Sequence, residues 1–315
     1  MRKDMINKTA LRQSAILFAA ALIWGFTFVA QSVGMDYVGP FTFIAARNIV
    51  ALLVLLPMAA VLDRRGKRRQ EPADRRKNHR LLLIGGICCG ICLFGGSTLQ
   101  QFGVREATVG KAGFISALYM VIVPLFGIFL GKKIGLRIWT AVALAALGMY
   151  LLCMTKGDFR LQTGDIYLFA CAVVFSVQIL SVDHFSPLVD GVKLSCVQTL
   201  TNAVLGAICM LLFERPDFDS ILAAWMPIVY AGALSSGLGY TFQIIGQKDL
   251  NPAVASLIMS LESVISALAG WLLLHQTLSA RELAGCALTF LAIILVQLPG
   301  RRRNSAESCA KESAS

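Results

Sequence analysis

Two ionisable side chains, Arg47 and Glu262, lie deep inside apolar stretches of this 315-residue sequence. Charge is costly in such surroundings, so charged residues there usually face a polar cavity or a partner. Glu262 lies near the middle of the stretch 252–274, where its carboxyl group must be paired, protonated or in contact with water. We therefore predict either a coupling role for Glu262, by exchange of a proton or a cation, or a structural hydrogen bond to a neighbouring helix.

Arg47 lies about eight residues into the stretch 40–62, which is roughly 12 Å along a helix. Three interpretations stay open at this depth. The long side chain reaches the membrane surface, or it forms an ion pair with Glu262 or another partner, or it lines a cavity. Lys111 lies only four residues inside its stretch, 108–130, and is expected to reach the headgroups.

The sequence contains an internal repeat. Leu-Phe-Ala at 17–19 recurs at 168–170, a shift of 151 positions, and Gln-x-x-Gly at 100–103 recurs at 243–246, a shift of 143. A longer connection between the second and third stretches of the first half accounts for the change in the shift. A repeat inside a very apolar chain is typical of secondary transporters.

Polar residues inside the apolar stretches correspond to one another under these shifts. Arg47 corresponds to Gln198, and Glu262 corresponds to Tyr119. If the Arg47 side chain merely reached the membrane surface, the corresponding position in the other half would not need to be polar. The repeat therefore favours a cavity. The predicted cavity residues are Arg47, Gln100, Tyr119, Gln178, Gln198, Tyr240 and Gln243, with Glu262 as the coupling residue and Thr27 and Asn202 as further candidates.

The composition indicates a membrane protein, since 57% of the residues are hydrophobic and 15% are charged. Apolar stretches of about 20 residues cross ~30 Å of hydrocarbon as helices, which satisfy their own backbone groups. They lie at 14–33, 40–62, 81–103, 108–130, 138–154, 164–183, 194–213, 221–245, 252–274 and 282–298. The predicted fold is an all-α membrane protein with ten transmembrane helices, five in each half.

Basic residues predict the orientation of these helices. With the amino end inside, inner segments hold 22 Lys and Arg residues and outer loops hold five, so both termini are expected in the cytoplasm. Because five is odd, the two halves insert with opposite polarity. The predicted parts are a cytoplasmic tail (1–13), a first five-helix repeat (14–154), a second (164–298) and a basic cytoplasmic tail (299–315).

Other functions of the basic and amino-terminal segments are less favoured. The run 63–80 has nine Lys and Arg residues but no aromatic residue, and lies between two membrane helices. It is expected to rest on anionic lipid headgroups and not to bind nucleic acid. The first stretch, 14–33, is longer than a signal-peptide core and has a counterpart at 164–183, so we expect it to be retained.

The sequence does not favour catalysis or metal binding. It contains no phosphate-binding Gly-x-x-x-x-Gly-Lys-Ser/Thr loop, no His-Glu-x-x-His and no Gly-x-Ser-x-Gly motif. Cys88, Cys89 and Cys92 lie among glycines in an apolar stretch, which favours close helix packing over a zinc site. We expect neither an enzyme nor a bound cofactor, with proton or cation coupling left open.

Several motifs resemble the EamA-type transporters of the drug/metabolite transporter superfamily. These are Leu-Ile-Trp-Gly-Phe-Thr-Phe-Val-Ala-Gln at 22–31, Gly-Pro-Phe-Thr-Phe-x-x-x-Arg at 39–47, Lys-Ala-Gly-Phe-Ile-Ser-x-Leu-Tyr at 111–119 and the block 239–285. The resemblance covers almost all of 11–298. It implies two inverted five-helix repeats, a central cavity and alternating access. It also carries Arg47, Tyr119 and Glu262 over as cavity or coupling candidates.

The sequence departs from this family pattern at two places. Ser263 stands where the family often has proline after the glutamate, which is expected to soften a kink there. Gln276 and the pair Lys132-Lys133 replace the usual acidic residue at the ends of the ninth and fourth stretches.

The expected function is therefore secondary active transport in the cytoplasmic membrane, with export of a small metabolite or amphipathic drug-like compound by alternating access. The alternative is a lipid-linked flippase or a lipid-modification accessory on the same fold. A receptor or scaffold is less favoured, because the longest loop has about 18 residues. The expected partners are a small-molecule substrate and the lipid bilayer. The sequence leaves open the substrate, the coupling ion and association as a homodimer.

Overall fold

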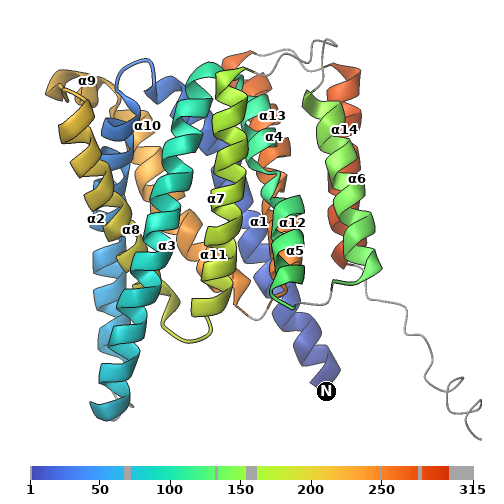
Figure 1. Ribbon diagram of the computed structural model, residues 1–315, viewed down its shortest axis with the longest axis horizontal. Helices are drawn as coiled ribbons and strands as arrows, with labels where there is room; N and C mark the ends of the chain where they lie inside the picture. The colour runs from blue at the N-terminus through green and yellow to red at the C-terminus, as the bar shows by residue number, and fades with distance from the viewer. Residues whose placement is uncertain are drawn as a thin grey trace, which may run out of the picture.

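Helices form the regular structure of the residues that the computed structural model describes, which are 2–66, 72–131, 134–153, 162–248, 250–275 and 279–297. Figure 1 shows most of them running side by side between two opposite ends of the bundle. They are α1 (Arg2–Gly34), α2 (Pro40–Gly66), α3 (Pro72–Glu106), α4 (Val109–Ser116), α5 (Tyr119–Phe129), α6 (Leu136–Cys153), α7 (Thr163–Phe185), α8 (Gly191–Phe213), α9 (Phe218–Ala223), α10 (Trp225–Val229), the π-helix η1 (Tyr230–Gly239), α11 (Tyr240–Gln247), α12 (Pro252–Met259), α13 (Leu261–Leu274) and α14 (Ala280–Gln297).

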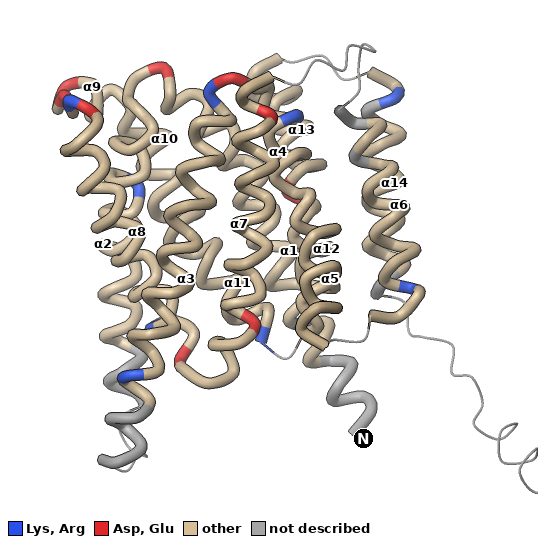
Figure 2. The backbone as a smooth tube through the Cα atoms, viewed as in Figure 1, with Lys and Arg blue, Asp and Glu red and all other residues tan. Residues whose placement is uncertain are grey.

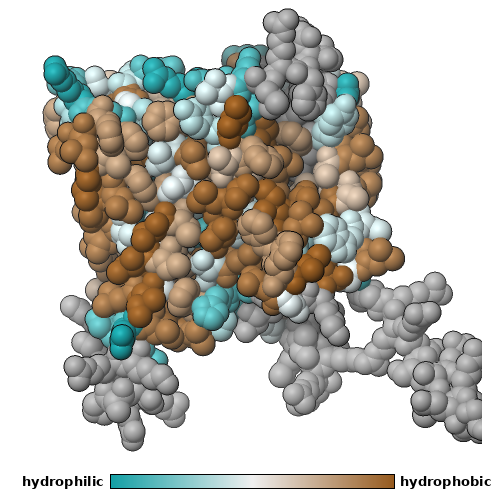
Figure 3. Space-filling model, viewed as in Figure 1, coloured by the Kyte–Doolittle hydropathy of each residue, from teal (hydrophilic) through white to brown (hydrophobic). Residues whose placement is uncertain are grey.

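The surface of the bundle fits a lipid environment. Eight helical segments of the described residues are long and apolar enough to cross a membrane, and two shorter apolar helices span Leu136–Gly148 and Leu283–Leu295. Most charged residues lie toward the two ends of the bundle (Figure 2), and a broad apolar belt lies between these ends on the visible face (Figure 3). The chain is therefore an all-helical, multi-pass membrane protein.

Some boundaries differ from those expected. The connection predicted at 63–80 is shorter, because α2 continues to Gly66 and α3 begins at Pro72. The short helix α9 lies in the connection after α8, where a loop was expected. Gln276, the pair Lys132-Lys133 and the tail 299–315 lie outside the described residues.

The predicted fourth and ninth stretches are each broken into two helices. The first of these helices, α4 and α12, are both eight residues long and lie 143 positions apart at both ends, as the repeat predicts. At the breaks the backbone forms tighter three-residue hydrogen bonds, from Leu118 N to Ile115 O and from Ser263 N to Ser260 O. The second break occurs at Ser260 without a proline. Tyr119 and Glu262 therefore stand at the first turn of α5 and of α13.

Helices from the two halves pack against each other in corresponding ways. α3 packs against α7, and α11 packs against α1. A Cβ atom at Gly103 would lie 2.4 Å from Leu168 Cγ, and one at Gly246 would lie 2.8 Å from Leu17 Cγ. Each pair corresponds to the other under the shifts of 143 and 151. Both interfaces depend on a glycine that lets the helices approach closely.

The π-helix η1 marks a one-residue difference between the halves. Gly90 packs against Thr201, and Gly232 packs in the corresponding way against Val50. These two glycines are 142 positions apart. Gly96 packs against the Phe175 ring, and Gly239 packs in the corresponding way against the Trp24 ring. These two glycines are 143 positions apart. A π-helical turn holds one more residue than an α-helical turn, so η1 accommodates the extra residue, and such segments are frequent at functional sites.

Candidate functional site

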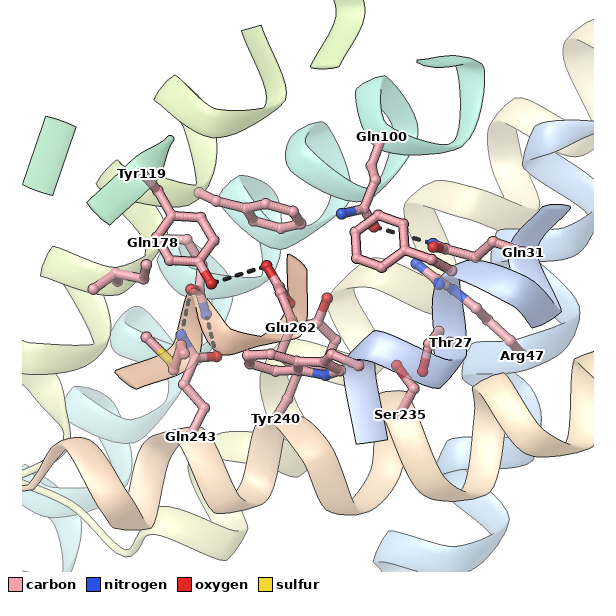
Figure 4. Close-up of a pocket in the computed structure, with 15 residues that line it drawn as sticks. Thr27, Gln31, Arg47, Gln100, Tyr119, Gln178, Ser235, Tyr240, Gln243 and Glu262 are labelled. Atoms are coloured by element: carbon pink, nitrogen blue, oxygen red, sulfur yellow. Dashed lines mark hydrogen bonds between the residues drawn. The ribbon is translucent and has the colours of Figure 1, made fainter. Parts of the chain in front are cut away.

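A polar cavity lies in the middle of the bundle, between helices of both halves (Figure 4). The space that can hold the centres of water molecules is about 40 Å³, and each water needs roughly 10–15 Å³ of such space. The cavity therefore has room for a few waters in this conformation. Its lining consists of Trp24, Thr27, Phe28, Gln31, Arg47, Gln100, Tyr119, Phe175, Gln178, Ile179, Ser235, Tyr240, Gln243, Met259 and Glu262.

Seven of the eight predicted site residues line this cavity, and the eighth does not. The seven are Arg47, Gln100, Tyr119, Gln178, Tyr240, Gln243 and Glu262. Gln198 is fully buried in α8, where α8 packs closely on α3 at Gly90. The further candidate Thr27 also belongs to the lining, whereas Asn202 donates a hydrogen bond to Asn48 of α2. The repeat thus relates Arg47 and Gln198 in sequence, but Arg47 lines the cavity and Gln198 is buried outside its lining.

Tyr119 and Glu262, which correspond in the repeat, meet directly. The Tyr119 hydroxyl donates a hydrogen bond of 2.9 Å to Glu262 Oε1. Both side chains are almost fully buried. Gly25 of α1 lies against α13, since a Cβ atom there would be 3.1 Å from the Glu262 carbonyl oxygen. The helix breaks before α5 and α13 thus bring a hydroxyl donor and a carboxyl acceptor together in the cavity.

Two glutamine pairs supply further polar groups. Gln31 Nε2 donates to Gln100 Oε1 at 3.0 Å, which links α1 to α3. Gln243 Nε2 donates to Gln178 Oε1 at 3.0 Å, which links α11 to α7. Gln100 and Gln243 correspond in the repeat. Their partners lie on corresponding helices but one turn apart, which is why Gln31 was not among the predicted residues.

Arg47 is 2% exposed and faces the cavity, not the outer surface. Its guanidinium carbon lies 5.8 Å from the centre of the Phe43 ring, within the range of a cation–π contact. Among the described residues it forms no ion pair, and its Nε is buried without a hydrogen-bond partner. In Figure 4 Arg47 lies with Gln31 and Thr27, away from Glu262 and Tyr119.

Aromatic and aliphatic side chains form the rest of the wall. The rings of Trp24 and Tyr240 lie 5.1 Å apart and are tilted by 51°. Phe28 and Phe175 also line the cavity. Sequence reasoning missed Trp24, Phe28, Phe175 and Ser235 as cavity residues, because nothing in an apolar stretch distinguishes a cavity wall from a helix interface. Their positions relative to Arg47 and Glu262 become visible only in the fold.

Lys111, which is expected to reach the headgroups, forms an ion pair with Asp165 of α7. Its Nζ lies 2.7 Å from Asp165 Oδ1 and 2.8 Å from Asp165 Oδ2. Asp165 also completes a capping box with Gln162 at the start of α7. The ion pair connects α4 to α7 across the two halves. Asp165, the third residue of α7, gives the ammonium group of Lys111 a carboxylate partner.

The described residues contain no group of three or more His, Cys, Asp or Glu side chains that could hold a metal ion. Seven cysteines in the described part of the chain are free thiols, including Cys88, Cys89 and Cys92. The side chains that line the cavity offer hydrogen bonding, charge pairing and proton exchange.

A family model, two relatives named as transporters and a solved structure are similar to this chain. The EamA-like transporter family model matches it twice, at residues 13–154 and 162–298. An uncharacterised transporter of Archaeoglobus fulgidus is 27% identical over 90% of this chain and 84% of its own length. The uncharacterised transporter YoaV of Bacillus subtilis is 21% identical over 91% of this chain and 97% of its own. A solved crystal structure, 23% identical, has a TM-score of 0.73 over 93% of this chain and 99% of its own, which supports the fold.

Proposed function

Because this chain belongs to the EamA-like transporter family, we propose that it moves a small solute across the cytoplasmic membrane through the central cavity by alternating access. The observation that carries the proposal is the cavity itself, which lies between helices of both matched segments and is lined by polar side chains from each. Sites of this kind between two repeats are where secondary transporters bind their substrates.

We propose further that the chain crosses the membrane ten times, with the shorter helices α6 and α14 as the fifth and tenth spans. The support is their matched place in the two halves and the excess of Lys and Arg in alternate connections. Both termini then lie in the cytoplasm, and the two halves insert with opposite polarity. Reporter fusions after Gly66 and Gly131 and at the two termini would all be cytoplasmic, and a periplasmic signal from any of them would contradict this topology.

Glu262 is the coupling residue in this proposal. When its carboxyl group is ionised, it accepts the hydrogen bond from Tyr119 and holds α13 to α5 at their helix breaks. When it is protonated, this charge-assisted bond is weakened, and α5 and α13 are freer to separate. Proton binding thereby changes the balance between conformations. A secondary transporter works in both directions, so the substrate and proton gradients decide the direction of net flux.

A flux assay tests the proposal. Metabolites that raise the thermal stability of the purified protein would be used as labelled solutes in proteoliposomes. Wild type is expected to show counterflow that responds to a pH gradient, and Glu262→Gln is expected to lose that response. Glu106→Gln, at an exposed position at the end of α3, is the matched control. Unchanged pH dependence in Glu262→Gln would remove Glu262 from the mechanism, and no counterflow of any stabilising solute would contradict transport.

A further inference from the structure

The charged groups of the cavity are few. Arg47 and Glu262 are the two Lys, Arg, Asp or Glu residues among its lining side chains. They enter from different halves, on α2 and on α13. The charge of the cavity therefore depends on a single proton. It is close to zero when Glu262 is ionised and close to +1 when Glu262 is protonated.

Arg47 creates a need for a negative charge. A guanidinium group stays protonated in proteins, and a buried cation is stable only with a partner. Within the described part of the chain, Arg47 has no acidic group in ion-pair distance and its Nε lacks a hydrogen-bond partner. Glu262 is the one acidic residue among the side chains that line the same cavity. Protonation of Glu262 leaves the guanidinium without a countercharge.

Starting from the proposed transport function, we propose that the substrate is a small organic anion, and that it binds together with one proton. The anionic group pairs with Arg47, whose planar guanidinium matches the two oxygens of a carboxylate or sulfonate. The proton neutralises Glu262. The tilted rings of Trp24 and Tyr240 offer a wall for a flat apolar body attached to the anionic group.

The other titratable groups near Glu262 leave this charge balance unchanged. Tyr119 on α5, Tyr240 on α11 and Cys171 on α7 interact with Glu262, and Cys286 on α14 lies in the same buried cluster. Phenols and thiols are neutral acids at physiological pH. The facing helices α1 and α12 contribute residues such as Trp24 and Met259 to the cavity, and neither titrates. Arg47 and Glu262 thus set the net charge.

Cooperative binding of an anion and a proton has consequences for transport. If each bound anion brings one proton, affinity falls tenfold for each pH unit above the titration of Glu262. The pair crosses the membrane without net charge, so transport is symport and is electrically silent. An inward proton gradient then drives uptake. Export, the direction expected from the sequence, would then require an outward substrate gradient larger than the inward proton gradient.

Binding can be read from Trp24 itself. Replacing Trp139, Trp225 and Trp271 by Phe leaves Trp24 as the single tryptophan. The probes are benzenesulfonate, which stays anionic at every pH used, its neutral isostere benzenesulfonamide, and benzyltrimethylammonium. Benzenesulfonate is expected to change Trp24 fluorescence and to take up one proton per molecule bound, measured with a pH indicator in weak buffer. The neutral and cationic probes are expected to bind at least tenfold more weakly.

Variants separate the roles of the two residues. Glu262→Gln is expected to bind benzenesulfonate without proton uptake and with an affinity that no longer depends on pH. Arg47→Gln is expected to lose anion binding, and Arg47→Lys to regain part of it, which excludes simple misfolding. Arg105→Gln and Glu106→Gln, at exposed positions at the end of α3, are the matched controls and should behave as wild type.

The outcomes distinguish this inference from the proposed function. Preference for the cation or the neutral probe, anion binding without proton uptake in wild type, or full binding in Arg47→Gln would overturn the anion site. The anion site would also be overturned if neither benzenesulfonate nor the smaller methanesulfonate bound, because a buried unpaired guanidinium should bind one of them with a dissociation constant below about 100 mM. If solute counterflow is then still observed, transport stands without the anion. If the anion binds as described but no solute is moved, the transport proposal fails and the anion site remains.

Discussion

The hydroxyl oxygen of Tyr119 lies 2.9 Å from a carboxylate oxygen of Glu262, and the two residues lie 143 positions apart at corresponding places in the two halves. Each stands in the first turn of a helix that begins at a break. A contact between corresponding residues of two repeats lies where the halves meet. The bond is therefore well placed to respond to a movement of one half against the other.

We expect Tyr119→Phe to destabilise the protein by about 1–3 kcal/mol, because a buried carboxyl oxygen loses its donor. The change also removes the link between α5 and α13, so the pH profile of counterflow should differ from that of wild type. Unfolding in detergent and counterflow at several pH values measure the two effects. Tyr37→Phe, at an exposed position, is the control, and equal behaviour of the two variants would show that the bond has no role.

The matched glycine contacts predict a matched pair of stability losses. Gly103→Ala and Gly246→Ala each place a methyl group against a leucine, at 2.4 Å from Leu168 Cγ and 2.8 Å from Leu17 Cγ. Each substitution is expected to lower the free energy of unfolding by about 1–3 kcal/mol through overpacking. Leu168→Ala should restore part of the loss in Gly103→Ala by making room.

Gly135→Ala is the control for both glycine variants, because a Cβ atom there has no neighbour within 4 Å. Its unfolding transition should match wild type. If Gly103→Ala and Gly246→Ala are equally harmless, the helices are not packed as closely as described.

The ion pair between Lys111 and Asp165 is expected to hold together the ends of α4 and α7 that the proposed topology places outside. The positions that correspond to it at the other end, Val254 and Ser14, cannot form an ion pair. Lys111→Gln should therefore weaken the association of α4 with α7 by about 1 kcal/mol and favour opening of the cavity on the outer side. Faster labelling of a cysteine at Thr27 from outside would report the opening. A variant with both charges reversed, Lys111→Asp with Asp165→Lys, should restore the wild-type labelling rate. Failure to restore it would show that the ion pair does not control the opening.

A pH effect is expected at the surface helix α9. Ser220 donates hydrogen bonds from its hydroxyl and its backbone to Asp217, which lowers the pKa of that carboxyl group. Because the folded form has the lower pKa, the cap is complete above the usual pKa of aspartate and is lost as the pH falls through the lowered value. Hydrogen exchange at the Ser220 amide should accelerate on acidification in wild type. An Asp217→Asn variant should show no such step, and a step of equal size there would contradict the assignment.

The helical segments and the repeat could be predicted because both leave a direct mark on the sequence. Lengths near 20 apolar residues mark the spans, and the shift of 143 positions places α4 on α12 residue by residue. The π-helix could not be predicted. It changes the shift by one position between Gly232 and Gly239, which no pattern of apolar residues reveals.

The cavity residues were predictable where they are polar. Arg47, Tyr119 and Glu262 are conspicuous because polarity is rare in an apolar stretch. The same argument pointed to Gln198, which is fully buried in α8 outside the lining of the cavity, since a polar side chain in an apolar stretch can also be buried among packed helices. Partners contributed by distant segments, such as Asp165 for Lys111, depend on helix packing and become visible only in the structure.

Access to the cavity from both sides of the membrane tests the central claim most directly. A single cysteine at Thr27, which lines the cavity, would be exposed to a membrane-impermeant thiol reagent in right-side-out and in inside-out vesicles. A cysteine at Leu53, on the lipid-facing surface and 68% exposed, is the control and should stay unlabelled. We predict labelling of the Thr27 position from either side, slowed by a transported solute. Labelling from one side alone, at every pH and solute concentration, would contradict alternating access.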